Sequence, residues 1–348
     1  MPEHELTVAL TGPTGDIGRS LVRRLDRDPQ IGHIVAMARR PFDPAAAGLT
    51  RTEYRRGDVL DRVAVEELVA GADVVVHLAF LIVGGHEETE RINLEGSRTV
   101  FEAAVEAGAS RIVYASSVAA YGFHADHPPL LTEDLPARGS ERHYYSAQKA
   151  RLEATLAEVL EGSSTEAYVM RPCIVAGADA LALVRNIPYV QLGELVRRFQ
   201  TPLSALLAEA ARRFPAARPV LPDPGVPFQL VHHDDVAAAF AEAVLGRGTP
   251  GAYNLAGPGE VTMSELASEL GWYSFRVPEA ALDGLAELVA RLPLMPAQAQ
   301  WIESIRQPVL MDTSRARREL GWQPHHDAHQ TLREMVEAAR AQGLLELR

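Results

Sequence analysis

The stretch "VALTGPTGDIGRSLV", residues 8–22, places three regularly spaced glycines between an apolar run and a helical pattern. The apolar run is typical of a strand, and the segment that follows has the periodicity of a helix. Gly12 permits a tight turn at the strand end, Gly15 lets a ligand approach the backbone, and Gly18 lets the helix pack closely. The stretch therefore predicts a strand, a loop and a helix whose positive N-terminus faces phosphate groups.

Apolar runs alternate with helical patterns through the first half of the chain. We expect strands near residues 6–10, 33–38, 52–57, 73–79, 111–116 and 166–171, and helices near 16–27, 61–70, 88–108 and 143–161. The strand runs are almost continuously apolar, which is typical of strands covered on both faces. The expected fold class is α/β, with a doubly wound parallel sheet of the Rossmann type.

The domain prediction is one large domain and one smaller lobe. Residues 1–175 would form the dinucleotide-binding domain, completed by residues 228–257, which have a strand, helix and strand pattern. Residues 176–227, which are interrupted by prolines, and residues 258–348 would form the smaller, discontinuous C-terminal substrate lobe and the closing helices.

The composition argues against several classes of partner. Hydrophobic residues make up 47% of the 348 residues, and no apolar run approaches the roughly 20 residues of a membrane span. The formal net charge of −12 argues against a nucleic-acid surface. The first residues have no signal-peptide pattern, so we expect a cytoplasmic protein with no membrane association.

Cysteine and histidine usage predicts no metal centre. Cys173 is the only cysteine, which excludes an internal disulfide and a multi-cysteine site, and it is expected to be a buried, inert thiol. The twelve histidines are scattered, and the adjacent His232 and His233 lack the spacing of a helical metal pair. We therefore expect no metal.

The end of the second predicted strand, "VAMARRPFD" at residues 35–43, bears on the choice between NAD and NADP. An acidic residue there would bind the ribose 2′-hydroxyl of NAD. Ala38 holds that position, and Arg39 and Arg40 follow; guanidinium groups pair well with a 2′-phosphate. The sequence favours NADP and leaves NAD possible; the alternative for the two arginines is a solvated basic turn.

The stretch "HYYSAQKARLE", residues 143–153, contains a possible catalytic pair. Tyr145 and Lys149 are four residues apart on one helical face, whereas Tyr144 is rotated away. A nearby ammonium and a nicotinamide cation would lower the pKa of the phenol. Ser116 and Ser117 end the fifth strand, where a hydroxyl can hydrogen-bond a substrate oxygen. A purely structural helix is the alternative if the pair is taken alone.

Six segments together resemble the extended short-chain dehydrogenase/reductase family, which includes NAD(P)-dependent epimerases and dehydratases. The resemblance covers essentially the whole chain, and it rests on "TGPTGDIG" (11–18), "GDVLD" (57–61), "HLAF" (77–80), "INLEGS" (92–97), "YASSVAAYG" (114–122) and "YSAQK" (145–149). It implies cofactor contacts for Gly12, Thr14, Gly15, Asp16, Ile17, Gly18, Arg39, Arg40, Asp58, Val59, Leu78, Ala79, Asn93, Ser116, Tyr145, Lys149, Arg171 and Pro172.

The resemblance also implies a mechanism, hydride exchange between the nicotinamide and a carbinol or carbonyl carbon. Tyr145 would pass the proton, Lys149 would hold the ribose and tune Tyr145, and Ser117 would bind the substrate oxygen. Ser116 would lie near the nicotinamide, and Asn93 would tie backbone segments together rather than touch the substrate. Many relatives dimerise through the helices near residues 95–107 and 143–161, so a homodimer is expected.

The chain departs from the nucleotide-sugar members of the family at several positions. In "RPCIVAGADA", Ile174, Ala176 and Ala178 replace an asparagine, a tyrosine and a proline, and no arginine precedes the His-x-x-Asp-Val segment. Gln148 replaces a small hydroxyl residue, with no obvious chemical consequence. These departures argue against binding of a nucleotide-sugar substrate through its nucleotide.

An apolar segment follows the fourth strand, where the nicotinamide is expected. Phe80, Leu81, Ile82 and Val83 there would favour a substrate with few hydroxyl groups, or would simply pack under the smaller lobe. The predicted substrate contacts are Phe80, Ile82, Ser117, Tyr121 as a pocket wall, and Phe123.

The preferred function is an NADP-linked oxidoreductase that acts on an alcohol or ketone of a small, fairly apolar metabolite. The first alternative is a nucleotide-sugar epimerase or dehydratase that uses the same serine, tyrosine and lysine. The second is a cofactor-sensing protein that binds NADP and does not catalyse.

Overall fold

The computed structural model describes residues 5–82, 86–141, 143–187, 189–191, 219–278 and 307–345. Residue contacts divide the chain into two compact units. The first unit consists of Met1–Cys173, Asp234–Ala256 and Met311–Gln323, and the second of Ile174–His233, Gly257–Leu310 and Pro324–Arg348.

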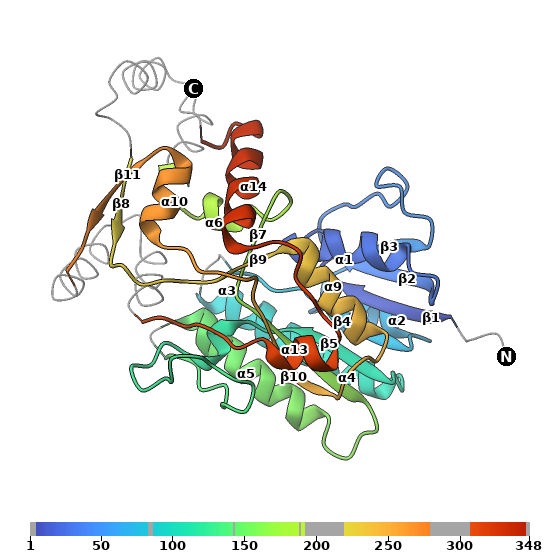
Figure 1. The fold of residues 1–348 in the computed structure, drawn as a ribbon. Helices are drawn as coiled ribbons and strands as arrows, with labels where there is room; N and C mark the ends of the chain where they lie inside the picture. The colour runs from blue at the N-terminus through green and yellow to red at the C-terminus, as the bar shows by residue number, and fades with distance from the viewer. Residues whose placement is uncertain are drawn as a thin grey trace. The chain divides into compact units, whose positions relative to one another are not determined.

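A seven-stranded parallel sheet forms the centre of the first unit and confirms the predicted fold class (Figure 1). Its strand order is β10-β6-β5-β4-β1-β2-β3. The strands are β1 Leu6–Thr11, β2 Ile31–Ala38, β3 Thr52–Arg56, β4 Val74–His77, β5 Arg111–Ala115, β6 Glu166–Pro172 and β10 Gly251–Leu255. The order reverses between β1 and β4, and in such sheets ligands bind in the crevice at the carboxyl ends of these two strands.

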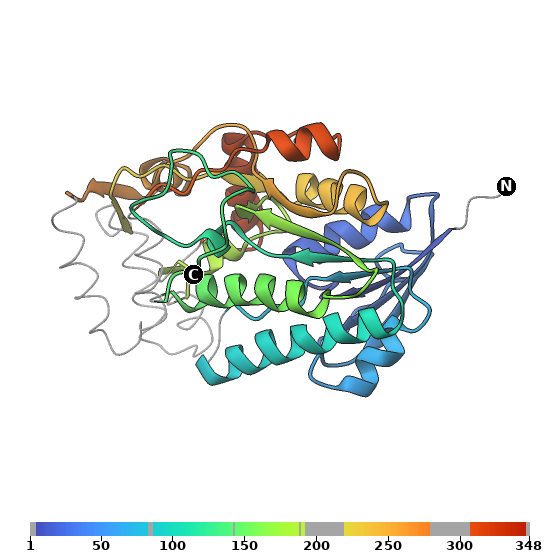
Figure 2. The same ribbon diagram turned by 90° about the horizontal axis from the view of Figure 1, so that it is seen from below.

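Helices cover both faces of this sheet (Figure 2). On one face lie α2 Arg62–Val69, α4 Gly96–Glu106 and α5 Tyr144–Val159, and on the other α1 Asp16–Asp26 and α9 His233–Val244. Leu68, Phe101 and Leu152 from the first group share one core with the strand residues Val75 and Ile112. This double cover explains why the strands are apolar without alternation. None of the described helices has the length and apolar character needed to traverse a lipid bilayer.

The helix expected near residues 88–108 is made of three consecutive segments. They are α3 His86–Glu90, the π-helical turn η1 Arg91–Glu95, and α4. Asn93 lies in the π-helical turn, where the backbone winds more widely than in an α-helix, and such turns are frequent at functional sites. The segment therefore positions Asn93 rather than continuing a regular helix.

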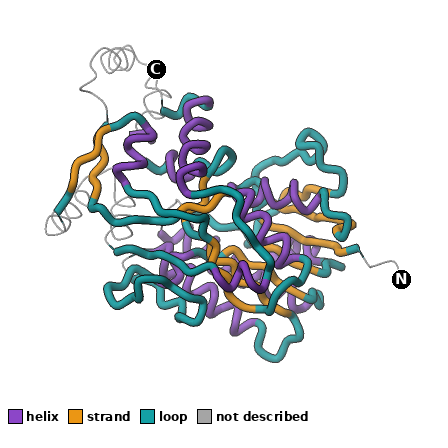
Figure 3. Tube along the Cα trace, in the orientation of Figure 1, coloured by secondary structure: helices purple, strands orange, loops and turns teal. Residues whose placement is uncertain are grey.

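The second unit contains two small parallel sheets, β7 with β9 and β8 with β11, and short helices (Figure 3). Its elements are β7 Ile174–Ala176, α6 Ala182–Arg185, β8 Val220–Asp223, β9 Leu230–His232, α10 Met263–Leu270, β11 Tyr273–Arg276 and α14 Ala328–Ala341. Capping boxes at Thr262 and Asp327 begin α10 and α14. Residues 192–218 and 279–306 of the expected lobe lie outside the described residues.

Residues 311–323 belong to the first unit, whereas the sequence placed them with the smaller lobe. The indole Nε1 of Trp322 donates to the carbonyl of Asp235, 2.8 Å away, and Asn254 Nδ2 donates to the carbonyl of Asp312, 3.2 Å away. These bonds attach the segment, which includes α13 Ser314–Glu319, to α9 and β10. The difference arises from tertiary contacts that local sequence does not display.

Candidate active site

The three glycines between β1 and the first turn of α1 differ in how much space a side chain would have. Gly12 has a φ of +79°, and a Cβ there would lie 2.9 Å from the Ala79 nitrogen. A Cβ at Gly18 would lie 2.1 Å from the Gly12 oxygen, so helix and loop pack too closely for any side chain. A Cβ at Gly15 would meet only the Gly12 oxygen, at 3.5 Å, an ordinary contact. The protein itself thus requires Gly12 and Gly18 but leaves space at Gly15.

The loop and the start of α1 fit the diphosphate of a dinucleotide. Gly15 is the N-cap of α1, and no side chain caps the helix there. The first N–H groups of a helix have no acceptor within it and carry partial positive charge, so they suit an anion. Thr14, Asp16 and Ile17 lie in this loop and first turn, where the sequence placed them. The space at Gly15 is on the same turn, which suits close approach of a phosphate.

The end of β2 carries two exposed arginines and no acidic residue at the predicted position. Ala38 ends the strand, and Arg39 and Arg40 follow. Arg40 Nη2 is 3.4 Å from both the carbonyl and the hydroxyl oxygen of Thr14 in the glycine loop. The Tyr54 hydroxyl donates to the carbonyls of Ala38 and Arg40 and fixes this turn. A guanidinium group therefore lies beside the loop that would hold the dinucleotide.

The neighbouring strand ends hold the other predicted cofactor residues. Asp58 and Val59 follow β3, and a Cβ at Gly96 would lie 2.5 Å from Val59 Cγ2. The backbone N–H groups of Leu78 and Ala79, directly after β4, donate to Thr11 Oγ1 at 3.2 Å. These bonds join the ends of β1 and β4, where the strand order reverses.

Ser117 and Tyr145 are hydrogen bonded through their side chains. Ser117 is the second residue after β5. Its Oγ accepts from the backbone N–H of Ala119 at 3.2 Å, which caps the short helix η2 Val118–Tyr121. Tyr145 lies in the first turn of α5, whose N-cap His143 accepts from the backbone N–H of Ser146. The structure thus brings together the predicted serine and tyrosine.

Lys149 lies one turn farther along α5 and is 3% exposed. Its Nζ donates to the carbonyl of Ala115 at 2.6 Å and to the hydroxyl of Tyr114 at 3.4 Å. It lies 5.9 Å from the centre of the Tyr145 ring. The lysine is therefore a neighbour of the tyrosine, as the spacing predicts, but its hydrogen bonds go to β5.

The pKa values of the pair correct one expectation. Burial raises the pKa of Tyr145, and the hydrogen bond with Ser117 opposes this rise only in part. Burial lowers the pKa of Lys149 to about 7, although the charge of Glu153 opposes the change. The lowered pKa that the sequence analysis predicted for the phenol is thus not produced by the protein's own groups, because desolvation of both side chains dominates.

Phe80 contacts both members of the pair. Its ring packs edge-on against Tyr145, with 5.4 Å between ring centres, and Lys149 Nζ lies 3.9 Å from its centre. Phe80 and Leu81 also pack against the core of the first unit, and the two alternatives for this apolar segment stay predictions. The Ile82 carbonyl accepts from the Tyr144 hydroxyl, and a contact of Ile82 with a substrate stays a prediction. Val83 lies outside the described residues.

Asn93 is fully buried and joins α5 to the segment after β4. Its Oδ1 accepts from the backbone N–H of Leu81 at 2.7 Å, and its Nδ2 donates to the carbonyl of Leu81 at 2.9 Å and to Gln148 Oε1 at 2.8 Å. Asn93 therefore braces the site, and its contact with a cofactor stays a prediction. Gln148, for which the sequence suggested no chemical consequence, accepts this bond.

A buried ion pair connects β5, α5 and β6 beneath the site. The Glu153 carboxylate accepts from Arg171 at 3.0 and 2.5 Å and from the Ser116 hydroxyl at 2.5 Å. Arg171 and Pro172 end β6, and both are buried. Glu153 was not among the predicted site residues, although it follows Lys149 by four residues and so shares its helical face. Contacts of Ser116, Arg171 and Pro172 with a cofactor stay predictions.

Tyr121 and Phe123 differ in their access to the site. Tyr121 has no exposed surface; its hydroxyl donates to Asn254 Oδ1 at 2.8 Å, and its ring lies under the Arg171 guanidinium. The expected pocket-wall position for Tyr121 is therefore wrong in this conformation, because Arg171 of β6 and Asn254 of β10 enclose the side chain. Phe123 is partly exposed and contacts His143, with 5.0 Å between ring centres.

A histidine cluster in the second unit has ligand atoms close together. His232, His326 and Glu334 have theirs within 4.8 Å of one another, and His232 Nε2 lies 3.0 Å from Glu334 Oε2. The two imidazole rings are stacked, with centres 3.8 Å apart and planes at 22°. A histidine binds a metal through a ring nitrogen lone pair that lies in the ring plane. Two stacked planes do not meet on one ion, so this conformation is not a metal site.

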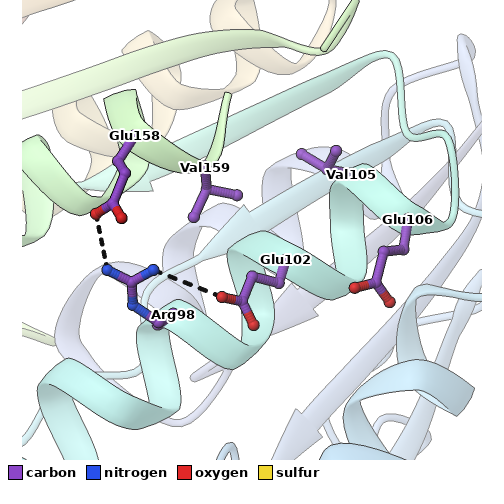
Figure 4. A pocket seen from close by; sticks show the side chains of 6 residues that line it. All are labelled: Arg98, Glu102, Val105, Glu106, Glu158 and Val159. Atoms are coloured by element: carbon purple, nitrogen blue, oxygen red, sulfur yellow. Dashed lines mark hydrogen bonds and ion pairs between the residues drawn. The ribbon is translucent and has the colours of Figure 1, made fainter. Parts of the chain in front are cut away.

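A shallow hollow lies between α4 and α5, away from the glycine loop (Figure 4). Its lining residues are Arg98, Glu102, Val105, Glu106, Glu158 and Val159. Tyr145 and Val159 are at opposite ends of α5, roughly 20 Å apart at 1.5 Å per residue. The hollow is therefore not part of the site around Ser117 and Tyr145.

Comparisons with known proteins agree with this geometry. The sequence model of the NAD dependent epimerase/dehydratase family matches residues 8–256. An uncharacterized protein of Mycobacterium tuberculosis is 27% identical over 340 residues, and the match covers 96% of this chain and 30% of that protein. Human 3 beta-hydroxysteroid dehydrogenase type 7 is 32% identical over 193 residues, 50% of this chain and 51% of that protein.

These two relatives are longer than the matched part, so the chain spans about a third and about half of their lengths. Among solved structures, UDP-glucuronic acid 4-epimerase from Bacillus cereus in complex with NAD superposes with a TM-score of 0.71 at 16% identity, over 97% of this chain and 99% of that chain. A likeness at this identity supports the fold. The family match extends through the glycine loop, Ser117, Tyr145 and Lys149.

Proposed function

Because the chain belongs to the NAD-dependent epimerase/dehydratase family, we propose that it is an NADP-linked oxidoreductase for an alcohol or ketone of a small, fairly apolar metabolite. The observation that carries this proposal is the hydrogen-bonded pair of Ser117 and Tyr145 with Lys149 one helical turn away. The bound nicotinamide would supply or accept the hydride, and the protein would handle the proton.

Each member of the site has a distinct part in this chemistry. In the reducing direction the Tyr145 hydroxyl donates a proton to the substrate oxygen, and in the oxidising direction the phenolate accepts it. The Ser117 hydroxyl donates to the same substrate oxygen as its charge changes. Lys149 holds the cofactor ribose, and the positive charge of an oxidised nicotinamide would favour the phenolate. Gly15 and the start of α1 hold the diphosphate.

The preference for NADP rests on Arg40. Its guanidinium lies beside Thr14 of the glycine loop, and Ala38 occupies the place of the acidic residue that selects NAD. A 2′-phosphate there would receive charge-assisted hydrogen bonds from Arg39 or Arg40. NAD remains the alternative cofactor.

The proposal of an apolar substrate rests on Phe80 and on the absence of residues that nucleotide-sugar enzymes of the family carry after β6. The Phe80 ring packs directly against Tyr145, so a substrate bearing several hydroxyl groups would lose hydrogen bonds to water beside it. Ile174 and Ala176 stand where nucleotide-sugar enzymes of the family carry polar or aromatic residues. The human relative is by name a hydroxysteroid dehydrogenase, and its alcohol is carried by an apolar skeleton.

An absorbance assay tests this function against its first alternative. We expect the protein to oxidise NADPH at 340 nm in the presence of one or more members of a panel of apolar ketones. A nucleotide-sugar epimerase or dehydratase would instead turn over a nucleotide sugar without net change in the cofactor. The alternative is favoured by the family name and by the Bacillus cereus structure.

The second alternative, a non-catalytic NADP sensor, predicts a different result. A sensor would bind NADPH and oxidise none of it with any ketone, and a Tyr145→Phe variant would keep every property of the wild-type protein. The hydrogen-bonded arrangement of Ser117 and Tyr145 favours the enzyme. A cytoplasmic location remains a prediction from the sequence.

We also propose that the protein forms a homodimer through α4 and α5. The hollow between them exposes charged side chains around Val105 and Val159 (Figure 4). Arg98 pairs there with Glu158 at 2.8 Å, and a copy related by two-fold symmetry would bring a second such pair to the same face. Sedimentation velocity tests this interface: we expect a dimer for the wild-type protein and a monomer for Val105→Glu, and a monomeric wild-type protein would refute it.

A further inference from the structure

The ammonium group of Lys149 has all three of its N–H donors engaged within the protein. A lysine ammonium carries three donors and no acceptor. Lys149 Nζ has the Ala115 carbonyl at 2.6 Å, the Tyr114 hydroxyl at 3.4 Å, and the centre of the Phe80 ring at 3.9 Å. The first two acceptors belong to β5 and its buried face, and the third is the face of an aromatic ring.

The three contacts differ in how readily a ligand could replace them. The Ala115 bond is short and made to the backbone of a central strand, and Tyr114 is a buried core residue of the same strand. Phe80 lies in the loop after β4 and is partly exposed. A neutral ring face is also a weaker acceptor for an ammonium N–H than a hydroxyl oxygen in a dry site. Phe80 is therefore the contact that a cofactor hydroxyl would displace.

We propose that Phe80 is a positioning residue of the dinucleotide site, whose ring holds the Lys149 ammonium in place until a ribose hydroxyl of the cofactor takes over its N–H donor. This inference rests on the proposed function, in which Lys149 holds the ribose. Phe80 also contacts Tyr145, so its displacement on cofactor binding releases the edge of the phenol at the same time. Binding of the cofactor and freeing of the acid are then one event.

Dinucleotide affinity, measured by fluorescence titration with NADPH and with NADH, tests this role without any knowledge of the substrate. Phe80→Leu keeps an apolar side chain but removes the ring face, so cofactor binding no longer displaces a cation–π contact. We expect the Kd to fall by roughly tenfold. Phe80→Tyr keeps the ring and should bind as the wild-type protein does. A purely structural Phe80 would weaken binding on substitution instead.

A double-mutant cycle separates this effect from general loosening of the loop. In a Lys149→Met background there is no ammonium to release, so Phe80→Leu should leave the Kd unchanged. The inference is overturned if Phe80→Leu weakens binding or leaves it unchanged, or if it tightens binding equally with and without Lys149. A wild-type protein that binds neither dinucleotide would overturn the proposed function and this inference together, whereas binding that Phe80→Leu weakens would overturn the inference alone.

Discussion

Burial has the largest effect on the pKa values of the two ionisable residues of the site, Lys149 and Tyr145. Lys149 is almost completely enclosed, and burial lowers its pKa to about 7, while burial raises the pKa of Tyr145. Burial thus disfavours the charged form of both side chains. A positively charged cofactor beside Tyr145 would favour the phenolate, which the protein's own groups disfavour.

The lowered pKa of Lys149 makes stability depend on pH in a defined direction. Between about pH 7 and the pKa of an exposed lysine near 10.4, the folded state binds fewer protons than the unfolded state, so raising the pH stabilises the fold. Lys149→Met lacks this dependence and should be more stable than the wild type at pH 7. Its advantage should shrink by about 2–3 kcal/mol at pH 9. Urea unfolding at both pH values checks this, and a difference independent of pH would contradict it.

Substitution of glycine by alanine should reduce the stability of the fold at position 18 and the affinity for NADPH at position 15. Gly18→Ala should destabilise the fold, because its Cβ would lie 2.1 Å from the Gly12 oxygen. Gly15→Ala should leave the midpoint of thermal unfolding nearly unchanged but weaken NADPH binding by roughly tenfold or more, because its Cβ would occupy space that a phosphate needs. Thermal unfolding and fluorescence titration of both variants check this. Equal binding by Gly15→Ala and the wild type would show that the loop holds no phosphate.

Sequence reasoning succeeded for residues whose partners are close along the chain. The pairing of Tyr145 with Lys149 follows from helical spacing, and the glycine pattern from its position after a strand. The hydrogen bond of Gln148 is to Asn93, 55 residues away, and the hydrogen bond that helps to bury Tyr121 is to Asn254 in β10. Neither could be predicted from the sequence. Such partners depend on tertiary structure, which spacing does not reveal.

At the scale of elements, the Glu153 and Arg171 ion pair joins α5 to the end of β6. Glu153→Gln would leave the Arg171 charge buried and unpaired, so we expect a loss of about 3–5 kcal/mol in the free energy of unfolding. Ser116→Ala removes only one hydrogen bond to the same carboxylate and should cost about 1 kcal/mol. Urea unfolding compares the two variants, and equal losses would show that the pair does not hold these elements together.

The end of β2 is the element that selects the cofactor. Arg40→Asp would replace a group that binds a 2′-phosphate with one that repels it and accepts from a ribose hydroxyl, so we expect NADPH affinity to fall by roughly tenfold or more and NADH affinity to rise. Arg27→Asp makes the same charge change at the other end of α1 and serves as the control. Fluorescence titration with both dinucleotides measures this. Parallel losses in the two variants would assign the effect to net charge.

The sequence predicted most of the elements of the first unit, because each apolar run is long and each helix has a clear period. It did not predict the π-helical turn at Arg91–Glu95, where Asn93 bonds the backbone of Leu81. The turn interrupts a sequence with ordinary helical propensity. Within it, Asn93 bonds to Leu81 and to Gln148, 12 and 55 residues away, and local propensity does not reveal such partners.

For the whole molecule, the doubly wound parallel sheet was accessible from the alternation of strands and helices, whereas the order of its strands comes from the structure. The return of residues 251–255 to the sheet as β10, beside β6, agrees with the expected completion of the first unit. The attachment of residues 311–323 to that unit was not foreseen, because Trp322 and Asp312 reveal their partners only in three dimensions. The sequence pattern therefore predicts the fold of the first unit more accurately than it predicts which residues belong to each unit.

The most direct test of the central claim is the rate of hydride transfer from NADPH to a ketone substrate in a Tyr145→Phe variant at saturating cofactor. Phenylalanine keeps the aromatic ring but has no proton to give. We expect unchanged NADPH affinity and a rate lowered by roughly 10²–10⁴-fold, the usual contribution of a positioned proton donor. A variant that transfers hydride as fast as the wild-type protein would contradict the assignment of Tyr145 as the acid and base of this site.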